Sequence, residues 1–379
     1  MSDDEADPEL LELLRKSLGI SSGPPAAPET KVLESASFIC DNSIDVALDM
    51  YGTQSAAESI WSQMQQRGYS RKSWSEHELH PSKEEMGDED RLNFIFTMDL
   101  LNFSFWTERD GDSRFAVDYK DKRWTGYWAL VAALRRALEE GIEITSPHFW
   151  HNGDMTIDTI RHVFRSATDD EMPLLQERFD VMIEAGEVLC MNFESCISSL
   201  VTSADHSAPG LANILAEHFP SFRDESRFEG RKVRFLKRAQ IFVADLWAAF
   251  DGQDWGDFDD IDKITMFADY RIPQILHTLG SMSYSPPLDA HIRAKREIPP
   301  GSSWEIQLRG CSIWSVESIR RQIKRKHPDA ELNAILIDFF LYDAMKELEK
   351  KAQESLTASK ENADVREMIP HHRTRSIWY

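Results

Sequence analysis

The stretch Lys237-Arg238-Ala239-Gln240-Ile241-Phe242-Val243-Ala244-Asp245-Leu246-Trp247 predicts a buried helix, and with it a mainly α-helical fold. It is the middle of a longer run, 233–250, in which apolar residues recur at helical spacing. One apolar stripe consists of Leu236, Ala239, Val243, Leu246, Trp247 and Phe250. A second patch, made of Ile241, Ala244 and Ala248, lies nearly opposite, so we expect burial on two sides of the helix.

Three charged residues interrupt this apolar helix. Lys237 lies beside the second patch, while Arg238 and Asp245 are two helical turns apart. Burying a charge costs free energy unless the charge is paired or used by a ligand. One interpretation is structural, with a lysine that extends its ammonium to water and an Arg238–Asp245 ion pair. The other is a functional site, and the spacing alone leaves both interpretations open.

Carboxylates recur in two more apolar segments. Asp269 lies within Phe267-Ala268-Asp269-Tyr270-Arg271-Ile272-Pro273-Gln274, where Arg271 is a neighbouring cation. In the predicted helix 331–349, Asp343 falls on the apolar stripe and Asp338 lies at its edge. A carboxylate on an apolar face needs either an internal cation or a ligand that donates to it. Carboxylates and a lysine among aromatic residues suit a cationic sugar transition state or a cationic ligand.

The remaining sequence predicts one compact multi-helix domain, 31–379, after a disordered acidic and proline-rich tail, 1–30. A short amphipathic helix is compatible with 8–18 inside that tail. Further helices are expected to open at 43 and to cover 125–140, 172–190, 211–219 and 315–326. A weak strand pattern occurs at 303–308, and the Asp-rich segment 251–262 is expected to be a solvated loop.

Composition excludes several classes of protein. The formal net charge of −22 disfavours a duplex nucleic acid or an anionic membrane as partner. The four cysteines show neither a disulfide framework nor metal-binding spacing, so we expect reduced thiols and a cytoplasmic protein, with the nucleus as the alternative. No nucleotide-binding glycine loop or metalloprotease motif is present. His148 with His151, and His371 with His372, are expected to be structural or solvated, so we predict neither metal nor cofactor.

Eight ordered segments resemble one known family, the queuosine salvage proteins, which are queuosine 5′-phosphate N-glycosylases. The segments span nearly everything after the tail. They are Leu101-Asn102-Phe103-Ser104-Phe105-Trp106, Gly126-Tyr127-Trp128, Met172-Pro173-Leu174-Leu175, Phe219-Pro220-Ser221-Phe222-Arg223-Asp224, Lys237–Trp247, Phe267–Gln274, Ile337–Asp343 and His372-Arg373-Thr374-Arg375-Ser376-Ile377-Trp378-Tyr379.

This resemblance implies a mainly α-helical fold that is distantly similar to helix-hairpin-helix DNA glycosylases. It implies hydrolysis of the N-glycosidic bond of queuosine 5′-phosphate, which releases queuine and ribose 5-phosphate. Queuine is then reinserted into tRNA, so the substrate is a small nucleotide, without stable binding of nucleic acid. The acidic charge balance agrees with that substrate.

The resemblance also suggests roles for particular residues. Asp269 would be the nucleophile or the stabiliser of the oxocarbenium ion, and Lys237 would bind the 5′-phosphate or orient Asp269. Asp338 and Asp343 would accept the donors of the base and of its amine. The other predicted substrate-binding residues are His77 at the base, Phe267 and Trp106 as stacking surfaces, and Asn102, Tyr270 and Arg271.

Two departures from the family pattern concern the shape of the pocket: Glu194-Ser195-Cys196 replaces a Gly-Ser-Phe triplet, and Tyr342 replaces a tryptophan. Two alternative functions remain. One is a nucleosidase for another purine nucleotide, and the other is a non-catalytic module that binds queuine or a nucleotide. A DNA glycosylase is a third option, which the net charge of −22 disfavours.

Overall fold

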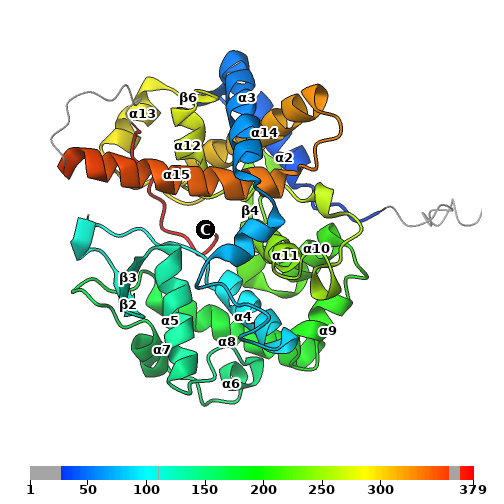
Figure 1. Cartoon of the computed structure of the whole chain (residues 1–379), viewed down its shortest axis with the longest axis vertical. Helices are drawn as coiled ribbons and strands as arrows, with labels where there is room; N and C mark the ends of the chain where they lie inside the picture. Colours follow the sequence, from blue (N-terminus) through cyan, green and yellow to red (C-terminus); the bar gives the residue numbers. More distant parts are fainter. Residues whose placement is uncertain (1–26, 110, 358–367) are drawn as a thin grey trace, which may run out of the picture.

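The computed structural model (Figure 1) describes residues 27–109, 111–357 and 368–379. The helix considered at 8–18 and nearly all of the predicted tail lie outside these residues. Most of the described chain is helical, which confirms the prediction of a mainly α fold. The longer helices are α2 (Val32–Asp41), α3 (Met50–Arg67), α4 (Asp88–Leu100), α5 (Tyr127–Glu139), α8 (Leu175–Asn192), α10 (Ala208–His218), α11 (Lys237–Ala249), α14 (Ser303–Lys326) and α15 (Ala334–Thr357).

Shorter elements connect these helices. The short α-helices are α6 (Pro147–His151), α7 (Ile157–Val163), α9 (Ile197–Thr202), α12 (Ile272–Thr278) and α13 (Pro286–Arg293), and the 3₁₀ helix η1 covers Arg71–Glu76. The strands form three antiparallel pairs: β1 (Val46–Leu48) with β6 (Met282–Tyr284), β2 (Ala116–Tyr119) with β3 (Lys122–Thr125), and β4 (Glu225–Phe228) with β5 (Arg231–Arg234). The pairs β2–β3 and β4–β5 are local hairpins, whereas β1–β6 joins distant parts of the sequence.

The helix α15 crosses the molecule between two groups of elements. In Figure 1 it runs between α3, α12 and α13 above and the β2–β3 hairpin with α5 below. The last residues of the chain pass near the centre of the same view. Segments far apart in the sequence therefore meet beneath α15, and this is where the cavity described below lies.

The central helix α11 is shorter than predicted. It begins at Lys237 and not at 233, because residues 231–234 form β5 and Leu236 adopts a left-handed conformation with φ of 51°. Asp224 closes the start of the helix by accepting a hydrogen bond from the Lys237 backbone N–H at 3.1 Å. All residues of α11 except Ile241 are buried, so burial on both sides is confirmed.

The strand predicted at 303–308 is wrong, because these residues form the first turns of α14. Trp304, Ile306 and Leu308 alternate with polar residues there, which is the period of a strand. Packing explains Gly310 inside this helix: a Cβ at Gly310 would lie 2.5 Å from Cγ2 of Ile39 in α2. Close approach of the two helices therefore requires it.

The other boundaries are mostly near their predicted places. The helix expected to open at 43 is also wrong, since residues 46–48 form β1 and α3 begins at Met50. Asp49 caps that helix, with its Oδ1 accepting from the Gly52 N–H at 2.5 Å. On the basic face of α14, Arg320 and Arg321 both form ion pairs with Glu317.

Candidate active site

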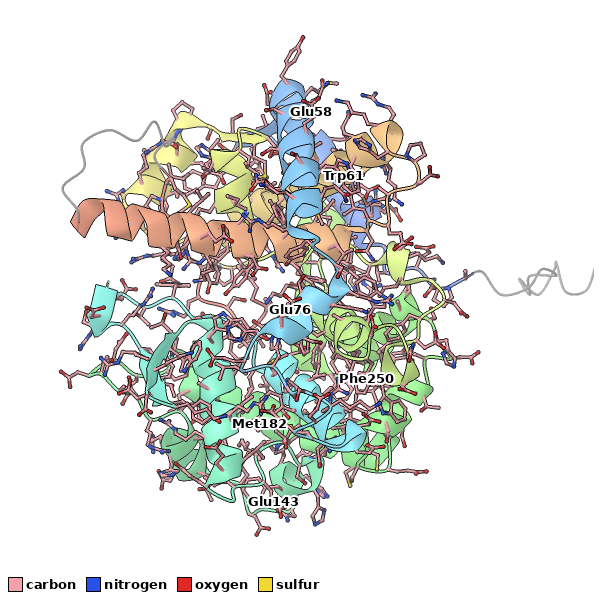
Figure 2. All side chains as sticks on the ribbon, in the orientation of Figure 1. Glu58, Trp61, Glu76, Glu143, Met182 and Phe250 are labelled. Atoms are coloured by element: carbon pink, nitrogen blue, oxygen red, sulfur yellow. The ribbon has the colours of Figure 1, made fainter. Side chains whose placement is uncertain are left out.

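A cavity of about 430 Å³ lies beneath α15. Its walls come from η1, the start of α5, α11, α15 and the segments 102–107, 267–272 and 371–379. Figure 2 shows side chains from α15 and from the elements below it filling the space around Glu76, which lines the cavity. This volume is typical of a site for a small molecule.

All ten predicted site residues line this one cavity, although they come from five separate parts of the sequence. They are His77, Asn102, Trp106, Lys237, Phe267, Asp269, Tyr270, Arg271, Asp338 and Asp343. The structure places them together, while their individual roles remain predictions.

Lys237 is a buried cation in the wall formed by α11. Only 5% of the residue is exposed, and Nζ donates to the backbone oxygen of Asn102 at 3.1 Å and to its Oδ1 at 3.3 Å. Burial lowers the pKa of Lys237, whereas the charges of Asp269, Asp99 and Asp338 oppose that shift. The ammonium is thus held in place by neutral oxygens and surrounded by carboxyl groups.

Asp269 is fixed at the start of α12. Its Oδ1 accepts from the backbone N–H of Arg271 at 2.7 Å and from that of Ile272 at 2.9 Å. Two backbone donors at a helix N-terminus complement a negative charge. The side chain is half-buried at the cavity wall, so the group is held without being hidden from a ligand.

Asp338 faces the cavity from α15 and is 6% exposed. Its Oδ1 accepts from the Phe267 N–H at 3.1 Å. Burial, and then the charge of Asp269, raise the pKa of Asp338 well above its usual range. The internal cation that the sequence allowed does not satisfy this carboxyl group, because its hydrogen bond comes from a backbone amide.

Asp343 differs from its prediction in burial. It does not lie on a buried stripe but is exposed at the rim of the cavity, where Oδ2 accepts from the Tyr69 hydroxyl at 2.7 Å. Leu341 and Met345 on either side of it are buried, so the buried face of α15 passes beside Asp343.

One end of the cavity is aromatic. The His77 ring is stacked on Trp128 with centroids 3.3 Å apart, and His80 is stacked on Trp74 at 3.7 Å. Burial lowers the pKa of His77 to about 4 and that of His80 to about 3, so both are neutral at pH 7. These flat surfaces suit contact with a nucleobase.

Another part of the cavity wall is basic, and we call it the basic end. Arg271 forms an ion pair with Glu349, and Lys346 lies 3.4 Å from the same carboxylate. Burial and the charge of Arg271 lower the pKa of Lys346 to about 8. Arg114 also lines this end. Arg271 and Lys346 share one acidic neighbour, and the charge of Arg114 acts on Lys346, so this part of the wall suits an anionic group of a ligand.

Two further predicted residues are engaged by the chain itself. Trp106 donates from Nε1 to the Thr374 oxygen at 2.8 Å, and the Arg375 guanidinium lies 3.6 Å from the centre of its ring. Tyr270 is 7% exposed and packs on His371, with ring centroids 4.8 Å apart. Both residues leave only part of their surface to a ligand.

An Arg238–Asp245 ion pair, which the helical spacing allowed, is not formed. Arg238 donates to the carbonyl oxygens of Leu100 and Ser221, and its guanidinium lies 5.0 Å from the ring centres of Phe103 and Phe222. Asp245 lines the cavity instead. Arg238 therefore packs behind the cavity wall, whereas Asp245 is part of that wall.

Sequence reasoning missed several lining residues: Tyr69, Trp74, His80, Tyr127, Trp128, Asp245 and Lys346. A signal existed for some of them. Tyr127 and Trp128 stand in a segment that resembles the family, and Lys346 lies eight residues after Asp338 on the same helix. Tyr69 and Trp74 gave no comparable signal, because Tyr69 lies between α3 and η1 and Trp74 lies in the short 3₁₀ helix η1 itself.

Among the residues that the structure describes, no group of three or more metal-binding side chains is placed to hold a metal ion. Within that same part of the chain, no helix is both long and apolar enough to cross a membrane.

Comparison with known proteins agrees with this geometry. The family model described as "Queuosine salvage protein" matches residues 79–379. This chain belongs to that family. A relative from Schizosaccharomyces pombe is 43% identical over 357 residues, covering 92% of this chain and 100% of the relative. Relatives from Nematostella vectensis and Mus musculus are each 40% identical, covering 91% and 94% of this chain and 97% and 100% of their own.

Each of these three relatives is named queuosine 5′-phosphate N-glycosylase/hydrolase. The matches extend over almost the whole of both chains, so the compared regions include most of the sequence that builds the cavity. The family resemblance seen in the eight sequence segments is confirmed.

Proposed function

We propose that this chain hydrolyses the N-glycosidic bond of queuosine 5′-phosphate and releases queuine and ribose 5-phosphate. The observation that carries this proposal is the placement of Asp269 and Lys237 in one cavity with an aromatic end and a basic end. A nucleotide has a flat base, a sugar and an anionic phosphate in that order. The names of the relatives support the same substrate.

Asp269 is proposed to act at the sugar. Breaking the bond between C1′ and the base places positive charge on C1′ and the ring oxygen, which a fixed anion stabilises. The two backbone hydrogen bonds hold Asp269 in place before the substrate arrives. Either covalent attack by Asp269 or electrostatic stabilisation is compatible with this position.

Lys237 is proposed to orient Asp269 and not to bind the phosphate. Its Nζ is already directed to Asn102, and its surroundings are carboxyl groups that would repel a phosphate. The basic end with Arg114, Arg271 and Lys346 is the better candidate for the 5′-phosphate.

Base recognition is assigned to the aromatic end and to two carboxyl groups of α15. Asp338 and Asp343 would accept hydrogen bonds from the guanine-like edge and from the secondary amine of queuine. Phe267 and His77 would contact the faces of the base.

The proposed partner is thus a small nucleotide, without a stable complex with nucleic acid and without a membrane. We also propose a cytoplasmic location, with the nucleus as the alternative. All four cysteines are free thiols, which is usual in these reducing compartments.

Incubation with queuosine 5′-phosphate, queuosine and guanosine 5′-phosphate, followed by chromatography of the free bases, tests the proposal. We expect queuine from the first compound at the highest rate. Release of base from guanosine 5′-phosphate alone would favour a nucleosidase for ordinary purine nucleotides. Binding of queuine without turnover of any of the three would indicate a non-catalytic binding module.

A further inference from the structure

The α11 face that lines the cavity carries a second ionisable group, which the proposed function leaves unused. Lys237, Ile241 and Asp245 are spaced four residues apart and all three line the cavity. Asp245 is 3% exposed and lies near the aromatic end, within hydrogen-bonding reach of the Trp74 side chain. A carboxyl group is therefore present where the base is expected.

Asp99 lies behind Asp245, near the end of α4. It is fully buried, and neither of its carboxyl oxygens has a hydrogen-bond partner within the described structure, although the Asn102 amide is close. An ionised carboxylate without partners is costly in such a place. A second carboxyl beside it makes ionisation of both costlier still.

The two carboxyl groups are not both ionised at neutral pH. Burial, followed by the charge of Asp245, raises the pKa of Asp99 well above its usual range. Burial raises the pKa of Asp245 to about 8, against the opposing effects of Trp74 and Lys237. Two adjacent buried carboxyls that cannot both ionise share a proton in the same manner in other enzymes.

Other ionisable groups face this pair from every side. Lys237 and Arg238 come from α11, Tyr127 from α5, and Asp338 from α15. The charge of Asp269 raises the pKa of Lys237 and that of Asp338, and these two groups in turn face the pair. The two cations are fixed by oxygens of the chain, so neither of them forms a salt bridge with Asp99.

We propose that Asp245 donates a proton to the departing base, and that Asp99 is a positioning residue whose buried carboxyl group disfavours ionisation of Asp245. The inference rests on the proposed function. The bond between C1′ and the base nitrogen breaks, its electron pair stays on the base, and the base takes the proton from Asp245. Water adds to C1′, and the proton that it loses restores the carboxyl pair through solvent.

The chemistry gives Asp245 a role that Asp269 does not fill. A glycosidase uses one carboxylate at the sugar and one carboxylic acid at the leaving group. Here Asp269 accepts hydrogen bonds from two backbone N–H groups, whereas Asp245 lies in an apolar and aromatic environment. Different environments give two carboxyl groups of one site different pKa values, so that one can act as an acid and the other as a base.

The first experiment compares two leaving groups in Asp245→Asn. With queuosine 5′-phosphate we expect kcat to fall by about 10² to 10⁴-fold, the usual contribution of a positioned acid, and with 4-nitrophenyl ribofuranoside 5-phosphate by less than about 10-fold. Nitrophenolate departs without a proton. Equal losses with both substrates would overturn proton donation by Asp245.

The second experiment measures kcat/KM against pH in Asp99→Asn. Without the neighbouring carboxyl, Asp245 should lose its proton at a lower pH. We expect the alkaline limb to move down by at least about one pH unit, while the kcat of the acidic plateau is retained. Thr97→Val, a buried change on the same helix, is the matched control and should leave the limb unmoved. An unmoved limb in Asp99→Asn would overturn the role of Asp99.

A measurement that needs no turnover separates this inference from the proposed function. Because the folded-state pKa of Asp99 is raised, its contribution to stability is present below the unfolded pKa and is lost as pH rises. Asparagine does not titrate, so the variant does not lose this stability as pH rises. The Tm of Asp99→Asn minus the Tm of the wild type should therefore increase from pH 5 to pH 8. A constant difference would overturn the shared proton, even if the wild type released no base.

Discussion

Arg309 donates two parallel hydrogen bonds to Asp224, from Nη1 to Oδ1 at 2.9 Å and from Nη2 to Oδ2 at 2.5 Å. Its Nε donates to the Ala268 oxygen at 3.0 Å. Asp224 accepts the Lys237 N–H, and Ala268 precedes Asp269 in the chain. One buried guanidinium therefore connects the start of α11 to the segment that carries Asp269.

Replacing Arg309 should unfold the protein more readily. Arg309→Met leaves Asp224 and Glu305 buried without their cation, and we expect a loss of about 3–5 kcal/mol in the free energy of unfolding. Denaturant titration measures the loss. Arg293→Met, which removes an exposed cation paired with Asp289, should cost less than about 1 kcal/mol. Equal losses in the two variants would contradict the structural role of Arg309.

Asp269→Asn should abolish most of the turnover while leaving the fold intact. The amide keeps the shape of the side chain but removes the charge that faces the sugar, so we expect kcat to fall by about 10²–10³-fold or more. Queuine binding, followed by calorimetry, should change little. Asp259→Asn, an exposed change in the neighbouring loop, is the control. Retained turnover in Asp269→Asn would refute the assignment.

Replacing the basic end should separate nucleotide from nucleoside. Lys346→Met and Arg271→Met should raise KM for queuosine 5′-phosphate by about 10-fold or more, since each charge-assisted contact contributes on the order of 1.5–3 kcal/mol. The KM for queuosine should stay nearly unchanged. Lys326→Met on the outer face of α14 provides a matched loss of charge. Equal effects on both substrates would place the phosphate elsewhere.

Stability should fall below pH 6.5 because of buried histidines. Burial lowers the folded-state pKa of His80 and of His372 to about 3. The unfolded chain binds protons at these sites near pH 6.5 and the folded chain does not, so the stabilisation present above pH 6.5 is lost on acidification. At pH 5.5 each should cost about 1 kcal/mol. Thermal melts from pH 8 to pH 5 test this, and His80→Gln should flatten the slope.

Much of the fold could be predicted because burial repeats with the helical period. The two-sided burial of α11 and the face of α15 were visible in the positions of Leu246, Ile335 and Asp338. The error at 303–308 arose because polar and apolar residues alternate there, while in the folded chain Glu305 and Gln307 are buried as well. A local pattern does not show that a polar side chain is buried by neighbours in space.

The candidate site was predictable where charge contradicted an apolar environment. Lys237, Asp269 and Asp338 are charged residues in apolar segments, which made them candidates, and the family resemblance suggested their roles. Asp99 escaped because an acidic residue near the end of a helix carries no signal of burial. Its lack of any hydrogen-bond partner is visible only when α4 and α11 are packed together.

The helix α15 sets the length of the ligand. Asp338 and Lys346 are eight residues apart, which at 1.5 Å per residue gives a separation of about 12 Å along the axis. Both residues line the cavity, and we propose that the first meets the base and the second the phosphate. Because a helix neither stretches nor shortens, we expect a ligand to be admitted by its span from base edge to phosphate, with one phosphate matching that span and a longer chain exceeding it.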